Sequence, residues 1–497
     1  MKMKSVPGAI MVALAVLPAA AKLTVDTSVS DNCVLLQNAE NVVKGSGVTA
    51  GAQVSMTFGG ASVASATADA DGKFVLTFNP GAANKTARQI VVTDGTTSQT
   101  ISNVLVGEVW YVSGQSNAEY PLGWEDFSGR IDDWTKDIDY PAIRVMTVPF
   151  NPYYSLTWQV CSNENYVNVT NMSATGFFFA KALYKHFDSN VPVGIVVAAK
   201  GGTKINAWVS KEKAESAGLT GTDGNLERDR TRRIYSVAMR GSIWYQGEAD
   251  GMGTCGKAYY VNWLTAYVEE LRTNLGRADF PVLVVGLPRY ADATMGIEAR
   301  WPAVREAQEA VAAKMSGVAC VPAIDLGASV KFGDANCIHP DDKPELADRL
   351  LLAARNLAYG EPGVRYRCPY PSSAVFNEEK MIDEIYSRVC VVMNSIKKYD
   401  YEIVFFDDGS TDNSRAEIEK LCLEDERVKA VFYRNNFGYS KTIFYCMQQA
   451  KGDCAILLHA DLQNPPEIIP QLIEKWESGS DAVFAARIFF VKLYSSD

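Results

Sequence analysis

Histidine is scarce in this sequence. Only three histidines, His186, His339 and His459, occur among the 497 residues. A reaction that needs an imidazole base near neutral pH must therefore use one of these three side chains. His186 lies in the amphipathic segment 180–187, which is typical of a helix packed on one face. His339 lies in a loop-like stretch before a predicted helix, and we favour it over His186 as a base.

Closely spaced cysteines and clustered positive charge are also lacking. None of the ten cysteines belongs to a Cys-x-x-Cys pair, so the spacing of a typical zinc site is excluded. The formal net charge is -10, and no long run of lysine or arginine occurs. Because binding to nucleic acid requires a concentrated basic surface, we expect no nucleic-acid partner.

Apolar runs long enough to cross a bilayer are lacking as well. Residues 1–4 contain two lysines, residues 6–17 are largely apolar, and residues 18–21 are proline and alanine. This order predicts a signal peptide over residues 1–21. We therefore expect a secreted or periplasmic protein with no stable membrane span after cleavage.

The length of the chain predicts roughly three domains. Residues 22–106 contain short segments of alternating apolar and polar residues, separated by glycine and aspartate turns. Two of these segments cover residues 53–58 and 73–78. Regular spacing of short strands and turns predicts an N-terminal β-sandwich.

Residues 107–363 change to buried strands that alternate with helices. This alternation predicts a doubly wound α/β domain with helices on both faces of a sheet. Ligands of such sheets bind at the carboxyl ends of the strands. The predicted strands cover residues 109–112, 193–197, 241–245 and 282–286, and the predicted helices cover residues 175–187, 258–276, 303–315 and 344–359.

A serine, two glycines, an amide and a histidine follow these strands in order. Ser116 follows the strand 109–112 through a tight turn, where a nucleophile would be exposed. Gly201 and Gly202 follow the strand 193–197, and Gln246 follows the strand 241–245. Each has a plain structural explanation alone, but together they are typical of a nucleophile, oxyanion donors and, in His339, a base.

Several separated motifs resemble the sialate O-acetylesterase family of SGNH-type hydrolases. They are Gly107-Glu-Val-Trp-Tyr-Val-Ser-Gly-Gln-Ser-Asn117, Lys200-Gly-Gly-Thr203, Ile243-Trp-Tyr-Gln-Gly-Glu248 and Ile338-His-Pro340. The resemblance runs from about residue 23 to residue 362. It implies attack by Ser116 on an acetyl ester of a carbohydrate, with His339 as base and Gly201, Gly202 and Gln246 at the oxyanion. It implies no cofactor.

The residue that orients His339 stays open at this stage. Many SGNH hydrolases carry an aspartate two or three residues before the histidine, where this chain has Cys337 and Asn336. Asp334 is the nearest upstream carboxylate and is one candidate. A serine–histidine dyad with a backbone carbonyl on the ring is the other.

Residues 374–497 follow a second boundary near residues 363–371 and predict a further α/β domain, which the resemblance given below implies is part of a nucleotide-sugar-binding domain. We expect a helix from Glu378 and strands over residues 401–406, 428–433 and 453–458. Residues 375–379, 402–414, 434–438 and 459–467 resemble family 2 glycosyltransferases of the polyprenyl-phosphate type. The resemblance implies nucleotide contacts from Asp407, Asp408 and Asp461, with Asp461 also binding Mg²⁺ or Mn²⁺.

Three functions compete on these observations. The first is a secreted O-acetylesterase that acts on acetylated sugars, among them sialic acid. The second is a glycosyltransferase fused to an esterase, and the third is a carbohydrate-binding protein without catalysis. We favour the first because it accounts for the ordered serine, glycine, amide and histidine motifs.

Overall fold

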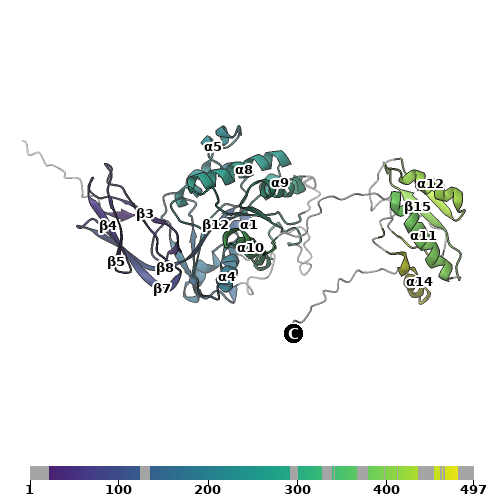
Figure 1. Cartoon of the computed structure of the whole chain (residues 1–497), viewed down its shortest axis with the longest axis horizontal. Helices are drawn as coiled ribbons and strands as arrows, with labels where there is room; N and C mark the ends of the chain where they lie inside the picture. The colour runs from purple at the N-terminus through teal and green to yellow at the C-terminus, as the bar shows by residue number, and fades with distance from the viewer. Residues whose placement is uncertain are drawn as a thin grey trace, which may run out of the picture. The chain divides into compact units, whose positions relative to one another are not determined.

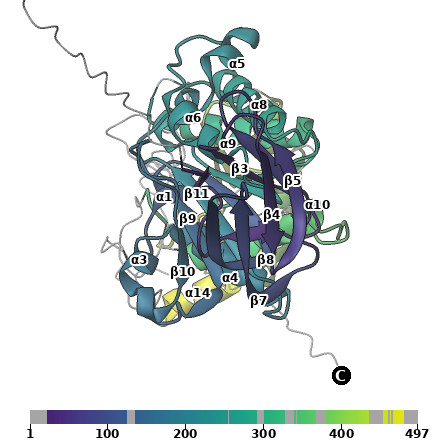
Figure 2. The same cartoon turned by 90° about the vertical axis from the view of Figure 1, so that its left-hand side faces the viewer.

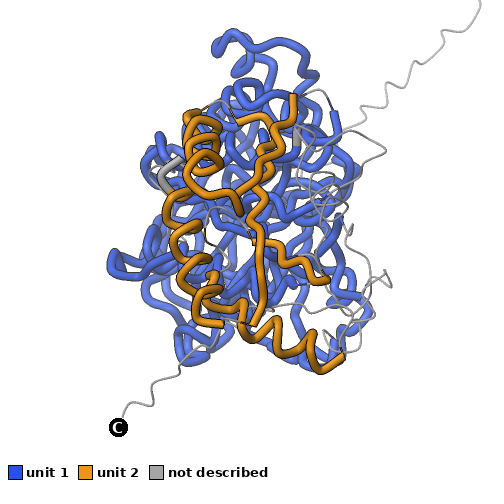
Figure 3. The backbone as a smooth tube through the Cα atoms, turned by 90° about the vertical axis from the view of Figure 1, so that its right-hand side faces the viewer, with its two compact units in different colours: residues 1–370 blue, residues 371–497 orange. Residues whose placement is uncertain are grey.

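The chain forms two compact units, which comprise residues 1–370 and 371–497 (Figure 3). The computed structural model describes residues 22–123, 135–253, 255–290, 300–326, 338–340, 342–366, 379–396, 398–410, 412–434, 453–458, 462 and 465–479 (Figure 1). The predicted signal peptide, residues 1–21, lies outside these ranges and stays a prediction. Within them, no helix is long and apolar enough to cross a membrane.

The N-terminal strands form two sheets. β1 (Thr24–Val25), β3 (Asn41–Ser46) and β6 (Phe74–Phe78) make an antiparallel three-stranded sheet. β2 (Val34–Leu36), β4 (Gln53–Phe58), β5 (Ala61–Thr67) and β7 (Asn84–Thr93) join a larger sheet through β8 (Ser98–Gly114) (Figure 2). The strand content is as expected, whereas the sandwich stays a prediction. The expected boundary at residues 106 and 107 falls inside β8.

Strand β8 connects this region to the central sheet. Its first part pairs antiparallel with β7, and its second part pairs parallel with β11 (Val193–Ala199) and β12 (Gly241–Tyr245). Every residue from Val104 to Gly114 is buried. Such continuous burial is typical of a parallel strand that is covered on both faces.

The central sheet has the order β10-β9-β11-β8-β12-β13-β14. Only β10 (Trp158–Cys161) runs antiparallel to its neighbour on this path, and it pairs with β9 (Tyr140–Thr147). β13 (Val282–Val285) and β14 (Val318–Val321) complete the order. The four strands predicted between residues 109 and 286 are confirmed, whereas β9, β10 and β14 were not predicted.

In the described part of the first unit, two pairs of helices cover the sheet. α4 (Ala174–His186) packs on α10 (Lys343–Ala358), and α8 (Lys257–Asn274) packs on α9 (Arg300–Lys314), with one pair on either side of the sheet (Figure 1). The predicted α/β arrangement is confirmed at this level. The shorter helices are α1 (Ser116–Glu119), η1 (Asn163–Asn165), α3 (Tyr166–Thr170), η2 (Ile205–Trp208), α5 (Lys211–Ser216), α6 (Asn225–Asp229), η3 (Thr231–Ile234) and α7 (Glu248–Gly251).

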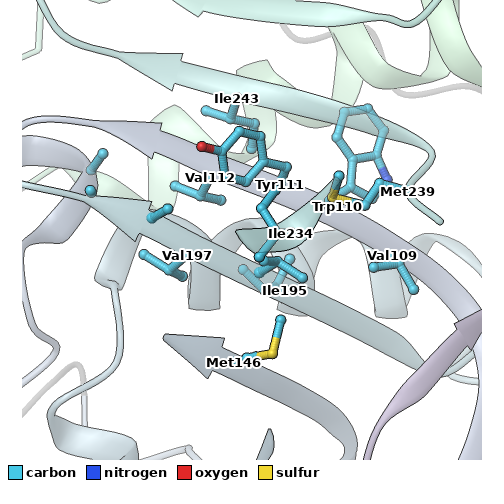
Figure 4. Packing of buried hydrophobic residues seen from close by; sticks show 14 of the residues in the cluster. Val109, Trp110, Tyr111, Val112, Met146, Ile195, Val197, Ile234, Met239 and Ile243 are labelled. Carbon is cyan, nitrogen blue, oxygen red and sulfur yellow. The ribbon is translucent and has the colours of Figure 1, made fainter. Parts of the chain in front are cut away.

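Side chains of β8 alternate between the two faces of the sheet and pack on its neighbours (Figure 4). Trp110 lies edge-to-face on Phe179 of α4, with ring centroids 5.0 Å apart. The Tyr111 hydroxyl lies 3.2 Å from the Thr231 hydroxyl of η3. Because both rings are buried completely, each contributes about 2 kcal/mol or more to stability through lost contact with water. The strand that leads to Ser116 is thus held from both sides.

The described residues of the second unit include two parallel strands. β15 (Ile403–Asp407) pairs with β16 (Val428–Phe432), next to α11 (Glu379–Ile396), α12 (Ser414–Glu424), η4 (Pro466–Ile468) and α14 (Ile469–Glu477). The strand predicted over residues 453–458 is wrong, since this segment has no regular structure. Ile456 and Leu458 pack on the apolar core beside α11 without entering a strand ladder, and a strand requires that pairing.

Candidate active site

Ser116 is the first residue of α1 and lies directly beyond the carboxyl end of β8. The turn requires glycine at position 114, where φ is +132° and a Cβ would lie 2.0 Å from the carbonyl oxygen of Tyr245. Gln115 then donates its N–H to the same oxygen over 3.0 Å. This turn leaves Ser116 half-buried at the edge where ligands of parallel sheets bind.

Gly201 lies against Ser116. A Cβ added to Gly201 would be 3.5 Å from the Cβ of Ser116, so the two backbones approach closely. Gly202 is exposed, has a φ of +70°, and borders open space where its Cβ would be. The structure therefore brings the predicted nucleophile and the predicted glycine pair together, although their roles stay predictions.

The Glu119 carboxylate accepts a hydrogen bond from the backbone N–H of Gly201. The Gly201 nitrogen donates to Glu119 Oε2 over 2.6 Å, a length typical of a hydrogen bond to a charged acceptor. Burial lowers the pKa of the Arg230 guanidinium. The negative charge of the nearby Glu119 carboxylate partly opposes that decrease. The expected oxyanion donor thus has an internal acceptor that a substrate must displace.

Asn117 links Ser116 to the histidine loop. Its Nδ2 donates to the carbonyl oxygen of Ile338 over 2.9 Å. Ser116 directly precedes Asn117, and His339 directly follows Ile338. Each of the two predicted residues is therefore the sequence neighbour of one partner in this hydrogen bond. The His339 ring also packs on Tyr120, with centroids 5.4 Å apart. These contacts hold the loop that carries the predicted base against the residues that directly follow the predicted nucleophile.

His186 lies at the far end of α4. The start of α4 borders the site, because Thr175 donates its hydroxyl to the Asn117 carbonyl oxygen over 2.8 Å. The helix has 13 residues, so its last residue is about 18 Å along the axis. There His186 Nε2 lies 3.4 Å from Glu361 Oε1. His186 therefore lies at the opposite end of α4 from the site, while the choice of His339 as the base stays a prediction.

Gln246 is fully buried, and its side-chain amide forms hydrogen bonds with other residues of the protein. Nε2 donates to Asp250 Oδ2 over 2.6 Å and to the Thr203 carbonyl oxygen over 3.0 Å, and Oε1 accepts from the Tyr260 hydroxyl over 2.8 Å. These bonds tie the end of β12 to the loop after Gly202. The role of Gln246 at the oxyanion stays a prediction, and the structure gives this side chain a bracing role besides.

A buried charge network lies behind the serine. Asn117 Nδ2 also donates to Glu248 Oε1 over 2.6 Å, and Lys343 Nζ donates to Asn117 Oδ1 over 2.6 Å. Burial raises the pKa of Glu248 to about 7, while the Asn117 hydrogen bond opposes that rise. Within the described residues, Glu248 Oε2 has no hydrogen-bond partner, which suits a carboxyl group that readily keeps its proton.

The remaining predicted residues are divided between the two units. Asp334 lies outside the described residues, so the orienting group of His339 stays a prediction. Asp407 ends β15 and accepts the N–H of Ser410 over 3.1 Å, with half-buried Asp408 next to it. Asp461 lies outside the described residues. Where the structure describes side chains, no cluster of three or more histidine, cysteine or acidic residues could hold a metal ion.

Sequence reasoning missed Glu119, Asn117, Glu248 and Lys343 as parts of the site. Asn117 and Glu248 stand inside the quoted motifs, which was an available signal. Nothing in the sequence near Lys343 indicated that its ammonium group would be buried. Only contact between segments 226 residues apart makes it a partner of Asn117.

Comparison with known proteins agrees with this geometry. Residues 106–340 match the family described as carbohydrate esterase, sialic acid-specific acetylesterase, and residues 374–493 match glycosyl transferase family 2. A carbohydrate acetylesterase from Xanthomonas citri is similar in structure, with a TM-score of 0.62 and 27% identity over 71% of this chain and 79% of that chain.

The second unit has curated relatives. It is 42% identical over 113 residues to the uncharacterized glycosyltransferase YkcC of Bacillus subtilis (strain 168) and to a bactoprenol glucosyl transferase of Shigella phage SfV. These matches cover 23% of this chain and 35% and 36% of the two relatives. The chain thus spans about a third of the length of these relatives.

The first unit has a mostly parallel α/β sheet with Ser116 beyond the carboxyl end of β8. Together with these matches, this arrangement indicates a carbohydrate esterase domain. Residues 106–340 thus form a domain that matches the carbohydrate esterase family of sialic acid-specific acetylesterases, and residues 374–493 form a domain similar to family 2 glycosyltransferases.

Proposed function

We propose that this protein is a secreted serine O-acetylesterase that removes acetyl groups from sialic acid or other glycans. One observation carries the proposal. The hydrogen bond from Asn117 to the Ile338 carbonyl oxygen holds the neighbours of Ser116 and His339 together at the carboxyl edge of the sheet. A nucleophile and an imidazole base held at one edge suit acyl transfer.

The proposed reaction has two halves. Ser116 Oγ attacks the acetyl carbonyl carbon while His339 takes the hydroxyl proton, and His339 then returns that proton to the departing sugar oxygen. Water next attacks the acyl-enzyme with His339 again as base, which releases acetate and restores Ser116.

The oxyanion receives hydrogen bonds from backbone donors. The Ser116 N–H belongs to the first turn of α1, where amides have no partner within the helix. The Gly201 N–H is the second donor once the substrate displaces Glu119. Each such donor contributes on the order of 3 kcal/mol to transition-state stabilisation.

Acetate release tests the proposal. The full-length protein is expected to release acetate from O-acetylated sialic acid or acetylated xylan, and Ser116→Ala and His339→Ala are each expected to lower kcat by about 10⁴-fold or more. Circular dichroism establishes that both variants keep the fold. Full activity in the serine variant, or no release by the native protein from any acetylated glycan, would sink the proposal.

For the second unit we propose binding of a nucleotide sugar. Asp407 and Asp408 stand at the carboxyl end of β15, where ligands of parallel sheets bind, and the relatives named above include a glucosyl transferase. Mg²⁺ or Mn²⁺ on Asp461 would offset the diphosphate charge. Calorimetric titration with UDP-glucose and Mn²⁺ should give binding that Asp407→Asn weakens, and absence of any binding heat would contradict this proposal.

A further inference from the structure

Three exposed aromatic side chains follow β9. Phe150 is 64% exposed, Tyr153 is 93% exposed and Tyr154 is 65% exposed. They belong to residues 148–155, which we call the aromatic loop. Exposed rings of this size leave a large apolar area in contact with water, and clustered exposed apolar groups often mark a binding surface.

The aromatic loop leaves the sheet at the same edge as Ser116. Strand β9 runs parallel to β11, with Thr147 opposite Val197, and β11 leads directly into Lys200 and Gly201. Lys200 Nζ lies 4.7 Å from the centre of the Phe150 ring. Gly201, the residue after Lys200, lies close enough to Ser116 that a Cβ added to it would be 3.5 Å from the Ser116 Cβ, so Phe150 lies near the serine.

Arginines hold the backbone of the aromatic loop. Arg230 Nη2 donates to the Val148 carbonyl oxygen over 2.6 Å, and Arg233 Nη2 donates to the Tyr154 carbonyl oxygen over 2.5 Å. Asn151 Oδ1 also accepts the N–H of Tyr153 over 3.0 Å. The rings are thus presented by a braced backbone, which lowers the entropy lost when a ligand binds.

We propose that the aromatic loop is a binding subsite for the sugar units next to the acetylated one. This inference rests on the function proposed above. Sugar rings present apolar C–H faces and hydroxyl groups, and tyrosines offer an apolar face and a polar tip in the same way. The aromatic loop lies at the same edge of the sheet as Ser116. This position favours the glycan that carries the ester, rather than a separate protein, as the occupant.

Substrate comparison tests this subsite in the full-length protein. We choose Tyr153→Ala/Tyr154→Ala, because Arg233 binds the Tyr154 carbonyl oxygen and the loop backbone keeps that anchor. The substrates are acetylated xylotetraose, acetylated xylose and 4-nitrophenyl acetate. The double variant is expected to lower kcat/KM on the tetrasaccharide about tenfold relative to the aryl ester.

Two controls accompany the double variant. Tyr153→Phe/Tyr154→Phe keeps the rings and should keep the preference for the tetrasaccharide. Val75→Ala truncates another exposed apolar side chain, which lies on β6 outside the central sheet, and should leave the ratio unchanged.

The outcomes separate the two proposals. Turnover of all three substrates with the same ratio in the alanine variant overturns the subsite alone. A second contrary outcome is an alanine variant that keeps the kcat/KM ratio of tetrasaccharide to aryl ester but shows a lower molecular mass than the native protein in light scattering. That result assigns the loop to a protein interface and also overturns the subsite. If the native protein hydrolyses no ester, the proposed function fails, and the subsite falls with it.

Discussion

The two units differ in how completely they bury their strands. In the first unit, all seven residues of β11 are buried, as are the part of β8 that pairs with β11 and all of β12 on the other side of β8. In the second unit, four of the five residues of β15 are only half-buried. A strand buried on both faces has little freedom to shift, because close-packed interiors allow few alternative positions. The first unit therefore provides the firmer base for positioning a serine and a histidine.

Ion pairs show the same contrast. Glu108 is 1% exposed and accepts from Arg240, Gln37 and Tyr359 over 2.7 to 3.0 Å. In the second unit, Arg388 pairs with Glu467 over 2.6 Å, but the two side chains are 33% and 55% exposed. Buried and exposed pairs of similar geometry differ in the cost of losing one partner.

The largest effect is expected for Arg240→Met. This change leaves the Glu108 carboxylate buried without its cation and should lower the free energy of unfolding of the first unit by about 3–5 kcal/mol. Denaturant unfolding of the full-length variant measures the effect. A loss below about 1 kcal/mol would show that Gln37 and Tyr359 alone satisfy Glu108, and would weaken the contrast between the units.

Glu248→Gln should remove a pH dependence of the first unit. Because the pKa of Glu248 is raised from 4.5 to about 7, this group's stabilising contribution is complete below pH 4.5 and is lost as the pH rises through 7. The glutamine variant cannot titrate, so its stability relative to the native protein should rise on the order of 3 kcal/mol between these limits. Thermal unfolding at pH 4.5 and pH 8 checks this, and an equal difference at both would contradict it.

Gly202→Ala should cost about 1 kcal/mol of stability, because φ is +70° while the position borders open space. Gly201→Ala introduces no such backbone strain, yet its Cβ would lie 3.3 Å from Glu119 Oε2 and 3.5 Å from the Ser116 Cβ. We expect the second variant to lose about tenfold in kcat/KM, since small displacements at a reacting group are costly. Acetate release and calorimetry on both variants separate strain from crowding.

The smallest effect is expected for Arg388→Met. Its ion pair with Glu467 is partly exposed, so the loss of stability should be small and should shrink further in salt. Calorimetry of the second-unit transition at low and high salt measures it. A loss as large as that of Arg240→Met would remove the distinction between the two units.

Much of the first unit could be predicted because its signals are local. The apolar runs at 193–197 and 241–245 are strands, and the rule for parallel sheets puts the residues that follow them at one edge. β9 was missed because Pro141 and Arg144 interrupt its apolar pattern. In the second unit, the apolar content of residues 453–458 predicts a strand, but a strand also requires a neighbour to pair with, and this segment has none among the described residues.

The sequence by itself determined which residues reach the edge of the sheet: Ser116, Gly201, Gly202 and Gln246 each follow a strand that its own residues encode. Tertiary structure alone decided what their polar atoms bind. Glu119 takes the N–H of Gly201, Asp250 takes the Gln246 amide, and Lys343 meets Asn117 from 226 positions away. The physical reason is that strand formation follows from neighbouring residues, whereas a buried polar atom must find its partner wherever folding places one.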